Sequence, residues 1–307
     1  MEDKFTKLYN KTGIPFQYWC LSVLRKVSNY QGIPEFSFTH PPSSGAQLGR
    51  TASIDIVALK TPPSFSRVFF SGLVLFSIEC KRANPKIKNW VFSKDPSKEN
   101  TVLPTYFLKR IKEIGAIKSF EHIIARNGVF PGLGYRSQED LDCCLHGIEL
   151  NESLTNINRN QNETIYKSLL QANHALNALF CKFQYPFPRI EDLCFPNEKK
   201  VNKILFLPIV VTTADLFIAD YDPEKVDLKT GEIDKKDIKF NGPKNWVTYE
   251  FPLPDYLKHS GEMNYLPSQE GTEILIDTER ITTFIVNSGH WKEFLEKFNL
   301  LSAEARR

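Results

Sequence analysis

Three segments in the first third of the chain alternate apolar and polar residues in the way that is typical of β-strands. They span residues 34–40, 52–60 and 68–82, and the third is apolar enough to favour a central position in a sheet. Residues 13–27 precede them and show helical spacing, with Pro15 in the first turn. The pattern therefore predicts a helix followed by three strands that can form a meander.

Two longer segments further along the chain carry apolar residues at helical spacing. We expect helices over residues 105–127 and 162–183, separated by an irregular insertion at about 128–160. Apolar runs at 203–213 and 215–222 predict two more core strands. The remainder of the chain, with several short alternating segments, is expected to be β-rich and to end in a helix.

The composition is that of an ordinary globular protein: 41% of the 307 residues are hydrophobic and 24% are charged. No apolar run approaches the ~20 residues of a transmembrane helix, and the N-terminus lacks the apolar centre of a signal peptide. The 6 cysteines show no paired CxxC spacing, so we expect core or surface thiols rather than a zinc site. We therefore expect a cytoplasmic protein without a membrane-spanning segment.

Charge is unevenly distributed along the chain. Residues 81–126 hold eleven Lys and Arg against four acids, a local balance of +7 in a chain whose net charge is +3. Such a basic region favours an anionic partner, although the same charges would also fit a solvated helix face. If the partner is a nucleic acid, we expect phosphate contacts from Lys86, Lys88, Lys94, Lys109, Arg110 and Lys112.

Charged residues on apolar strands are the candidates for a catalytic or metal-binding site. Asp55 lies between two isoleucines in "SIDIVA", and Glu79 and Lys81 share one face of the next strand, in "FSIECKRA". A buried acid is costly unless it is paired or bound to a cation. If the two strands are antiparallel neighbours, the carboxylates can converge and hold Mg²⁺ or Mn²⁺, with Lys81 beside the attacking water or the phosphate. A structural ion pair between Glu79 and Lys81 is the alternative.

This arrangement resembles the PD-(D/E)xK nuclease superfamily over residues 14–215, in which an acid is followed on the next strand by acid-x-lysine. The segment "IECKRANPKIKNWVF" is also similar to bacterial nuclease-like proteins in which "WVF" closely follows the motif. The resemblance implies an α/β protein with a restriction-endonuclease-like αβββαβ core, whose central mixed sheet is flanked by helices. We expect that core at residues 1–220 and a β-rich C-terminal extension at 221–307, packed on the core either within the same domain or as a separate one.

The resemblance also implies roles for individual residues. Asp55 and Glu79 would bind Mg²⁺, with Mn²⁺ as a substitute, and the backbone carbonyl of Cys80 would be a further ligand. Lys81 would orient or help to deprotonate the attacking water and stabilise the transition state.

The chain departs from some members of the superfamily at two positions. Gln17 occupies the place of a glutamate that joins the metal shell from the first helix, and Ser53 replaces an acid that precedes the aspartate. Both departures leave Asp55, Glu79 and Lys81 in place but remove acids that could bind a second metal ion. Gln171 resembles the glutamine that several members place beside the site, and a polar residue on the helix surface is the alternative interpretation.

The sequence thus predicts a Mg²⁺-dependent nuclease that hydrolyses phosphodiester bonds in DNA, in a restriction or defence role. One alternative is a nuclease-like DNA-binding or assembly module whose catalysis is weak or lost, and another is a nuclease directed at RNA. By analogy with the superfamily, we expect a homodimer or a component of a multi-protein defence complex.

Overall fold

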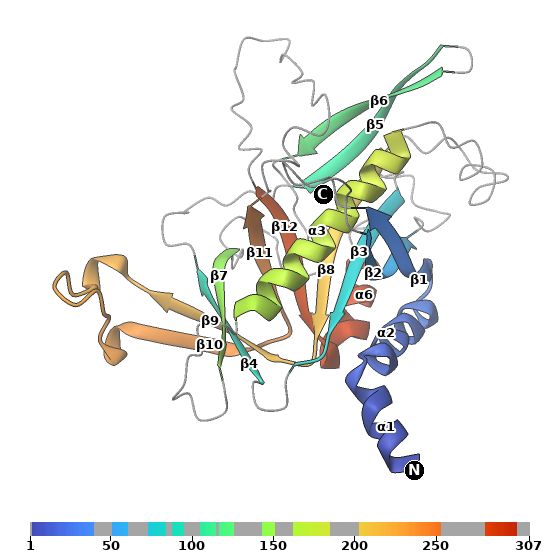
Figure 1. The fold of residues 1–307 in the computed structure, drawn as a ribbon. Helices are drawn as coiled ribbons and strands as arrows, with labels where there is room; N and C mark the ends of the chain where they lie inside the picture. The colour runs from blue at the N-terminus through green and yellow to red at the C-terminus, as the bar shows by residue number, and fades with distance from the viewer. Residues whose placement is uncertain are drawn as a thin grey trace, which may run out of the picture.

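The structure is a computed structural model, and it shows a mixed α/β protein with one large mixed sheet and a few helices (Figure 1). It describes residues 2–39, 51–60, 73–83, 88–94, 105–114, 117–125, 143–150, 162–184, 203–252 and 280–299. None of the helices in these ranges has the length and the apolar run needed to cross a membrane.

The described helices are α1 (Glu2–Lys11), α2 (Ile14–Lys26), α3 (Asn162–Gln184) and α6 (Trp291–Asn299). Gly13 separates α1 from α2 with φ of 82°, a left-handed conformation that glycine adopts without strain. The helix predicted at residues 13–27 is therefore confirmed as α2, and the one at 162–183 is confirmed as α3.

The strands run in sequence from β1 to β12. Their bounds are β1 Tyr30–Thr39, β2 Thr51–Lys60, β3 Leu73–Lys81, β4 Asn89–Lys94, β5 Thr105–Ile114, β6 Ile117–Ala125, β7 Cys143–Leu150, β8 Lys203–Thr212, β9 Asp215–Tyr221, β10 Ile238–Lys244, β11 Trp246–Pro252 and β12 Arg280–Asn287. The three predicted N-terminal strands correspond to β1, β2 and β3, and the two predicted core strands to β8 and β9.

The strands join one sheet in the order β1-β2-β3-β8-β12-β11-β7-β4-β9-β10. Strands β1, β2 and β3 form an antiparallel meander, and β8 pairs with β3 in parallel after the chain has passed through α3. Strand β12 then pairs in parallel with β8, so the strands after residue 221 continue the same sheet.

Helices cover the two faces of this sheet (Figure 1). Leu169, Ala172 and Ala175 of α3 pack over one face, in a cluster that includes Leu75 of β3 and Val210 of β8. The opposite face packs against α2 and α6, in a second cluster formed by alternate residues of the same strands. The alternation of side chains along β3 and β8 therefore buries both faces, which explains why these strands are almost wholly apolar.

The helix predicted at residues 105–127 is wrong. The described parts of this segment form the antiparallel pair β5 and β6, and β5 also pairs with the first half of β8, from Lys109↔Lys203 to Tyr106↔Phe206. The apolar spacing fits a helix locally, but β8 has a free edge there because β12 pairs only with its second half. The apolar spacing within residues 105–127 does not reveal this pairing with a strand that is distant in the sequence.

The irregular insertion predicted at residues 128–160 is also wrong in part. It contains β7, which lies inside the sheet between β11 and β4. The buried Glu149 of β7 accepts hydrogen bonds from the Thr164 side chain and the Ile165 N–H, in the first turn of α3. A carboxylate at this position satisfies N–H groups that have no partner within the helix.

Candidate active site

The candidate site lies where the ladder between β2 and β3 ends. The two strands pair from Lys60↔Val74 to Ile56↔Ile78, and Asp55 and Glu79 follow immediately beyond the last pair. Ser77 of β3 donates from its hydroxyl to the Ala172 carbonyl of α3 at 2.8 Å, which identifies the face that α3 covers. Because side chains alternate, Glu79 and Lys81 lie on this same face.

A break in the alternation of β2 places Asp55 at this point. Ala52 and Ile54 pack with the cluster under α3, whereas Ile56 and Ala58 pack with the cluster against α2 and α6. In a regular strand these four even-numbered residues would share one face. The strand therefore turns over at Asp55, which allows both flanking isoleucines to be fully buried.

The backbone and side chain of Asp55 are each held by a hydrogen bond. The Cys80 N–H donates to Asp55 Oδ2 at 2.7 Å, and the Gln17 side-chain amide donates to the Asp55 carbonyl at 2.7 Å. The first bond draws the carboxylate toward β3, and the second ties β2 to α2. These two hydrogen bonds hold Asp55 beside Glu79 without the help of a ligand.

Glu79 is the most deeply buried member of the site. Its side chain is 1% exposed, and Oε1 accepts from Lys81 Nζ at 2.6 Å. The other oxygen, Oε2, is buried and has no hydrogen-bond partner among the residues that the structure describes. The Lys81 side chain is 30% exposed, so its ammonium group bridges the buried carboxylate and solvent.

Burial perturbs the pKa of both acids, and the charge of Asp55 adds to the effect on Glu79. Burial, followed by the nearby charge of Asp55, raises the pKa of Glu79 from 4.5 to about 8, and Lys81 and the Asp55 backbone N–H offset part of this increase. The pKa of Asp55 is also raised by burial, although the Cys80 N–H and Lys81 oppose the change. For Lys81, burial is the largest single influence and lowers the pKa, but the attraction of Glu79, with smaller contributions from Asp55 and Cys80, produces a net increase. The three charges therefore influence one another, and Glu79 and Lys81 are in direct contact.

Cys80 contributes its backbone to this site, and its thiol points away. The thiol is buried on the opposite face, where it contacts the thiol of Cys20 from α2.

Of the described residues, no group of three or more His, Cys, Asp or Glu lies close enough to hold a metal ion jointly. The role predicted for the Cys80 carbonyl stays a prediction.

The two glutamines singled out in the sequence both contact β2. Gln171 of α3 donates its side-chain amide to the Ser53 carbonyl, from the helix opposite to the one that carries Gln17. The strand that bears Asp55 is therefore tied through its carbonyls to helices on both faces of the sheet. Each amide positions the strand.

Glu35 of β1 also lies beside the site, and the sequence did not predict it there. The flanking register pairs are Pro34↔Ile56 and Phe36↔Ile54, so Glu35 lies opposite Asp55. Its charge contributes to the raised pKa of Asp55, after the larger effects of burial, Cys80 and Lys81. Aligning the predicted strands of the meander with one another could have paired these two acids.

The predicted basic residues divide into separate groups. Lys88 lies near the end of β3, because the Asp215 N–H donates to its carbonyl and the Thr213 N–H donates to that of Lys81. Lys94 lies at the far end of β4, and Lys86 lies outside the described residues.

The other three basic residues, Lys109, Arg110 and Lys112, lie on β5. This strand pairs with the opposite end of β8 from Thr212, the neighbour of Lys81. Nine residues of extended strand separate the two ends, on the order of 30 Å. The structure does not bring these three residues to the site.

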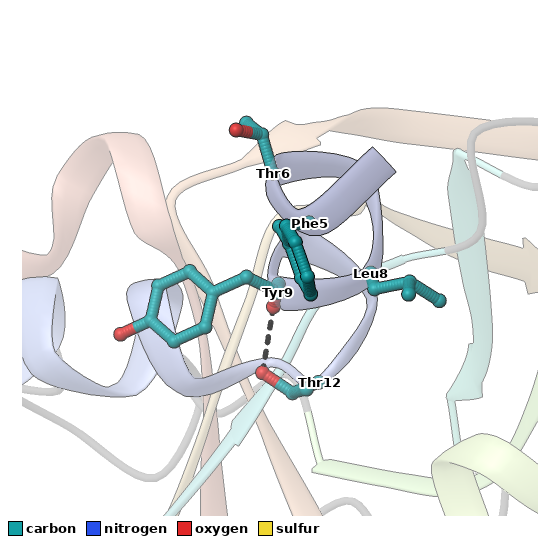
Figure 2. A pocket seen from close by; sticks show the side chains of 5 residues that line it. All are labelled: Phe5, Thr6, Leu8, Tyr9 and Thr12. Carbon is teal, nitrogen blue, oxygen red and sulfur yellow. Dashed lines mark hydrogen bonds between the residues drawn. The ribbon is translucent and has the colours of Figure 1, made fainter. Parts of the chain in front are cut away.

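A hollow on the surface of α1 is a different kind of feature. Figure 2 shows its lining side chains, Phe5, Thr6, Leu8, Tyr9 and Thr12. The Thr12 hydroxyl donates to the Tyr9 carbonyl at 2.7 Å, and no carboxylate or amine is among the lining groups. The hollow offers nothing with which to bind a cation or to activate water, so the candidate chemistry remains at Asp55 and Glu79.

Comparison with known proteins gives no match for this chain, whether with family models, curated sequences or solved structures. The geometry of the site is therefore the basis on which a function can be proposed.

Proposed function

We propose that the chain is a Mg²⁺-dependent nuclease that hydrolyses phosphodiester bonds in DNA. The observation that carries the proposal is a buried carboxylate oxygen, Glu79 Oε2, without a protein partner among the described residues and next to a second acid, Asp55. Buried polar atoms are nearly always hydrogen-bonded. Glu149 Oε1 also lacks a partner among the described residues, but no second acid among them perturbs Glu149, so the proposal depends on the pairing of Glu79 with Asp55.

The order of the elements supports a restriction-endonuclease-like core. Helix α2 precedes the antiparallel meander β1-β2-β3, and α3 leads into β8, which pairs in parallel with β3. Four further strands, β4 to β7, lie between β3 and α3 in the chain, so the order is compatible with the αβββαβ arrangement of PD-(D/E)xK nucleases if those strands are an insertion. The acids lie at the end of the second and third strands of that meander, where the superfamily motif would place them.

The residues present fit a hard divalent cation. Two carboxylates supply the oxygen ligands that Mg²⁺ prefers, and the ion usually keeps several waters in addition. With both carboxylates ionised, the site would hold two negative charges against the one ammonium group of Lys81, and a bound cation would favour this ionised state over the protonated Glu79 that its raised pKa implies. Asp55 and Glu79 would hold Mg²⁺ or Mn²⁺, with the Cys80 carbonyl as a further candidate ligand.

Mg²⁺ would supply Lewis-acid polarisation of the phosphate and a lower pKa for water. The chain itself would provide orientation and charge. Gln17 and the Cys80 N–H fix Asp55, and Glu79 holds the Lys81 ammonium at 2.6 Å. Lys81 is partly exposed, so it can donate to a phosphate oxygen and stabilise the charge that develops there.

Cleavage of plasmid and linear DNA with Mg²⁺, with and without chelator, tests the proposal. We expect the parent to cut only with Mg²⁺, and Asp55→Asn, Glu79→Gln and Lys81→Met each to lose at least about 10²-fold in rate, the cost of removing one preorganised electrostatic group. Glu232→Gln, an exposed acid between β9 and β10, is the matched control. Equal cleavage by the parent and all three site variants would contradict the proposal.

One observation favours a second function, a DNA-binding or assembly module without catalysis. Gln17, which replaces an acid of some relatives, uses its amide to hold the Asp55 carbonyl and brings no negative charge to the site. DNA binding by the parent without cleavage of DNA or RNA, in Mg²⁺ or Mn²⁺, would support this alternative. Cleavage of RNA alone would retain the proposed chemistry and change the substrate.

A further inference from the structure

Glu35 lies in an unusual backbone conformation beside the candidate site. It has φ of 54°, in the left-handed region, within a strand whose neighbouring residues pair normally with β2. Non-glycine residues seldom adopt this region, and doing so costs of order 1 kcal/mol or more. The strained residue therefore lies directly opposite Asp55 in the pairing of β1 with β2.

The strain accompanies a reversal of β1 that matches the one in β2. Tyr30 packs in the cluster against α2 and α6, whereas Phe36 and Phe38 pack against the cluster under α3. All three positions are even-numbered, so the alternation of side chains reverses between Tyr30 and Phe36. The left-handed residue in this interval is Glu35. Both strands thus change face around the opposed positions of Glu35 and Asp55, and an acid occupies each.

The charge of Glu35 reaches the site. Its carboxylate is exposed, unlike the buried Glu79, and its repulsion is one of the influences that raise the pKa of Asp55. The register of β1 and β2 holds Glu35 opposite Asp55, and Glu79 Oε2 lacks a protein partner among the described residues. With all three acids ionised, the single ammonium group of Lys81 would leave two negative charges, which one divalent cation would balance.

We propose that Glu35 is a third carboxylate of the metal centre, acting on the cation through the ion's hydration shell. This inference rests on the proposed function and assigns β1 a part in it. An outer-sphere role fits the exposed position of Glu35, and it fits the absence, among the described residues, of three acids close enough to bind one ion directly. Mg²⁺ retains several waters in protein sites, and an exposed carboxylate can accept hydrogen bonds from them.

Calorimetric titration of the full chain with Mn²⁺ tests the role of Glu35. We expect Glu35→Gln to weaken Mn²⁺ binding about fivefold to tenfold, the effect of removing one charge from a divalent ion across a hydrated gap. Glu35→Asn should weaken it similarly, although asparagine adopts the left-handed region more readily and should preserve the fold. Glu232→Gln is the matched control, and the melting temperature without metal reports on folding.

The outcomes separate this inference from the proposed function. Unchanged Mn²⁺ affinity in Glu35→Gln and Glu35→Asn, with binding lost in Asp55→Asn, would overturn the inference and leave the metal centre in place. An equal loss in Glu232→Gln would also overturn it, because the effect would then be one of overall charge. A parent chain that binds no Mn²⁺ would overturn the metal centre and the inference together.

Discussion

Two buried charged residues on neighbouring strands, Lys60 of β2 and Glu79 of β3, differ in whether the described residues supply all their hydrogen-bond partners. Lys60, at the end of the strand, is buried and donates from Nζ to the Phe298 carbonyl of α6 at 2.9 Å, with the Phe298 ring centroid 5.0 Å away. Asp55, five residues earlier, lies beside Glu79, whose Oε2 has no partner among the described residues.

The difference indicates which charged group is structural. The last carbonyls of a helix have no partner within it, so the Lys60 ammonium satisfies an acceptor and complements the negative end of α6. The Lys60 ammonium group and the Phe298 carbonyl thus each gain a hydrogen-bond partner. At the other site, the Glu79 carboxylate is left half satisfied, which is costly unless another ligand is present. Burial of a charge alone would not have separated the two.

The largest effect expected from this comparison is in the response of stability to Mg²⁺. At a concentration about 100 times the Kd, Mg²⁺ should raise the free energy of unfolding of the parent by about 2.7 kcal/mol. Glu79→Gln should lose this increase, because an amide cannot replace a carboxylate as a ligand for a hard cation. Urea unfolding with and without Mg²⁺ measures both values.

Lys60→Met is the matched comparison for the other site. It removes a buried charge of β2 that lies away from the acids, so its response to Mg²⁺ should equal that of the parent. The two sites would not differ as proposed if Lys60→Met lost the response, or if Glu79→Gln kept it.

The next largest effect is a dependence of stability on pH at Lys60. Burial lowers the pKa of Lys60 from 10.5 to about 8. Between these values the unfolded chain binds more protons than the folded one, so the free energy of unfolding rises as the pH increases. From pH 8 to pH 10 the parent should gain about 2 kcal/mol relative to Lys60→Met. Urea titrations of both proteins at the two pH values measure the gain, and a constant difference would contradict it.

The sequence predicted which strand face Glu79 and Lys81 share, but it did not predict the backbone of β2. Alternation in β3 correctly placed Glu79 and Lys81 on one face, because that strand is regular along its whole ladder with β8. The same reasoning in β2 did not foresee that Ile54 and Ile56 pack on opposite faces. The reversal at Asp55 is matched in β1, so it depends on the pairing of two strands and not on either sequence alone.

The larger sheet was predicted least well, for a related reason. The helices α2 and α3 pack against the sheet through one face each, and their local spacing is sufficient to identify them. Strand β5 instead depends on the unoccupied half of an edge of β8, almost 100 residues later in the chain. Consequently Lys109, Arg110 and Lys112 lie on a strand and not on the predicted helix, and their phosphate contacts stay a prediction.

The smallest expected effect tests whether the contacts of Lys60 and its neighbours with α6 are independent of the acids. Tyr30 is buried and donates from its hydroxyl to the Leu295 carbonyl of α6 at 3.0 Å, so it secures the same helix as Lys60. Tyr30→Phe should lower the free energy of unfolding by about 1 kcal/mol, the net value of one buried hydrogen bond. Tyr9→Phe, at a side chain that is 55% exposed on α1, is the matched control and should change little. Urea unfolding at pH 7 measures both, since burial raises the pKa of Tyr30 and the hydroxyl keeps its proton there. The response to Mg²⁺ should remain that of the parent in both variants, and a reduced response in Tyr30→Phe would mean that α6 and the acids act as one unit.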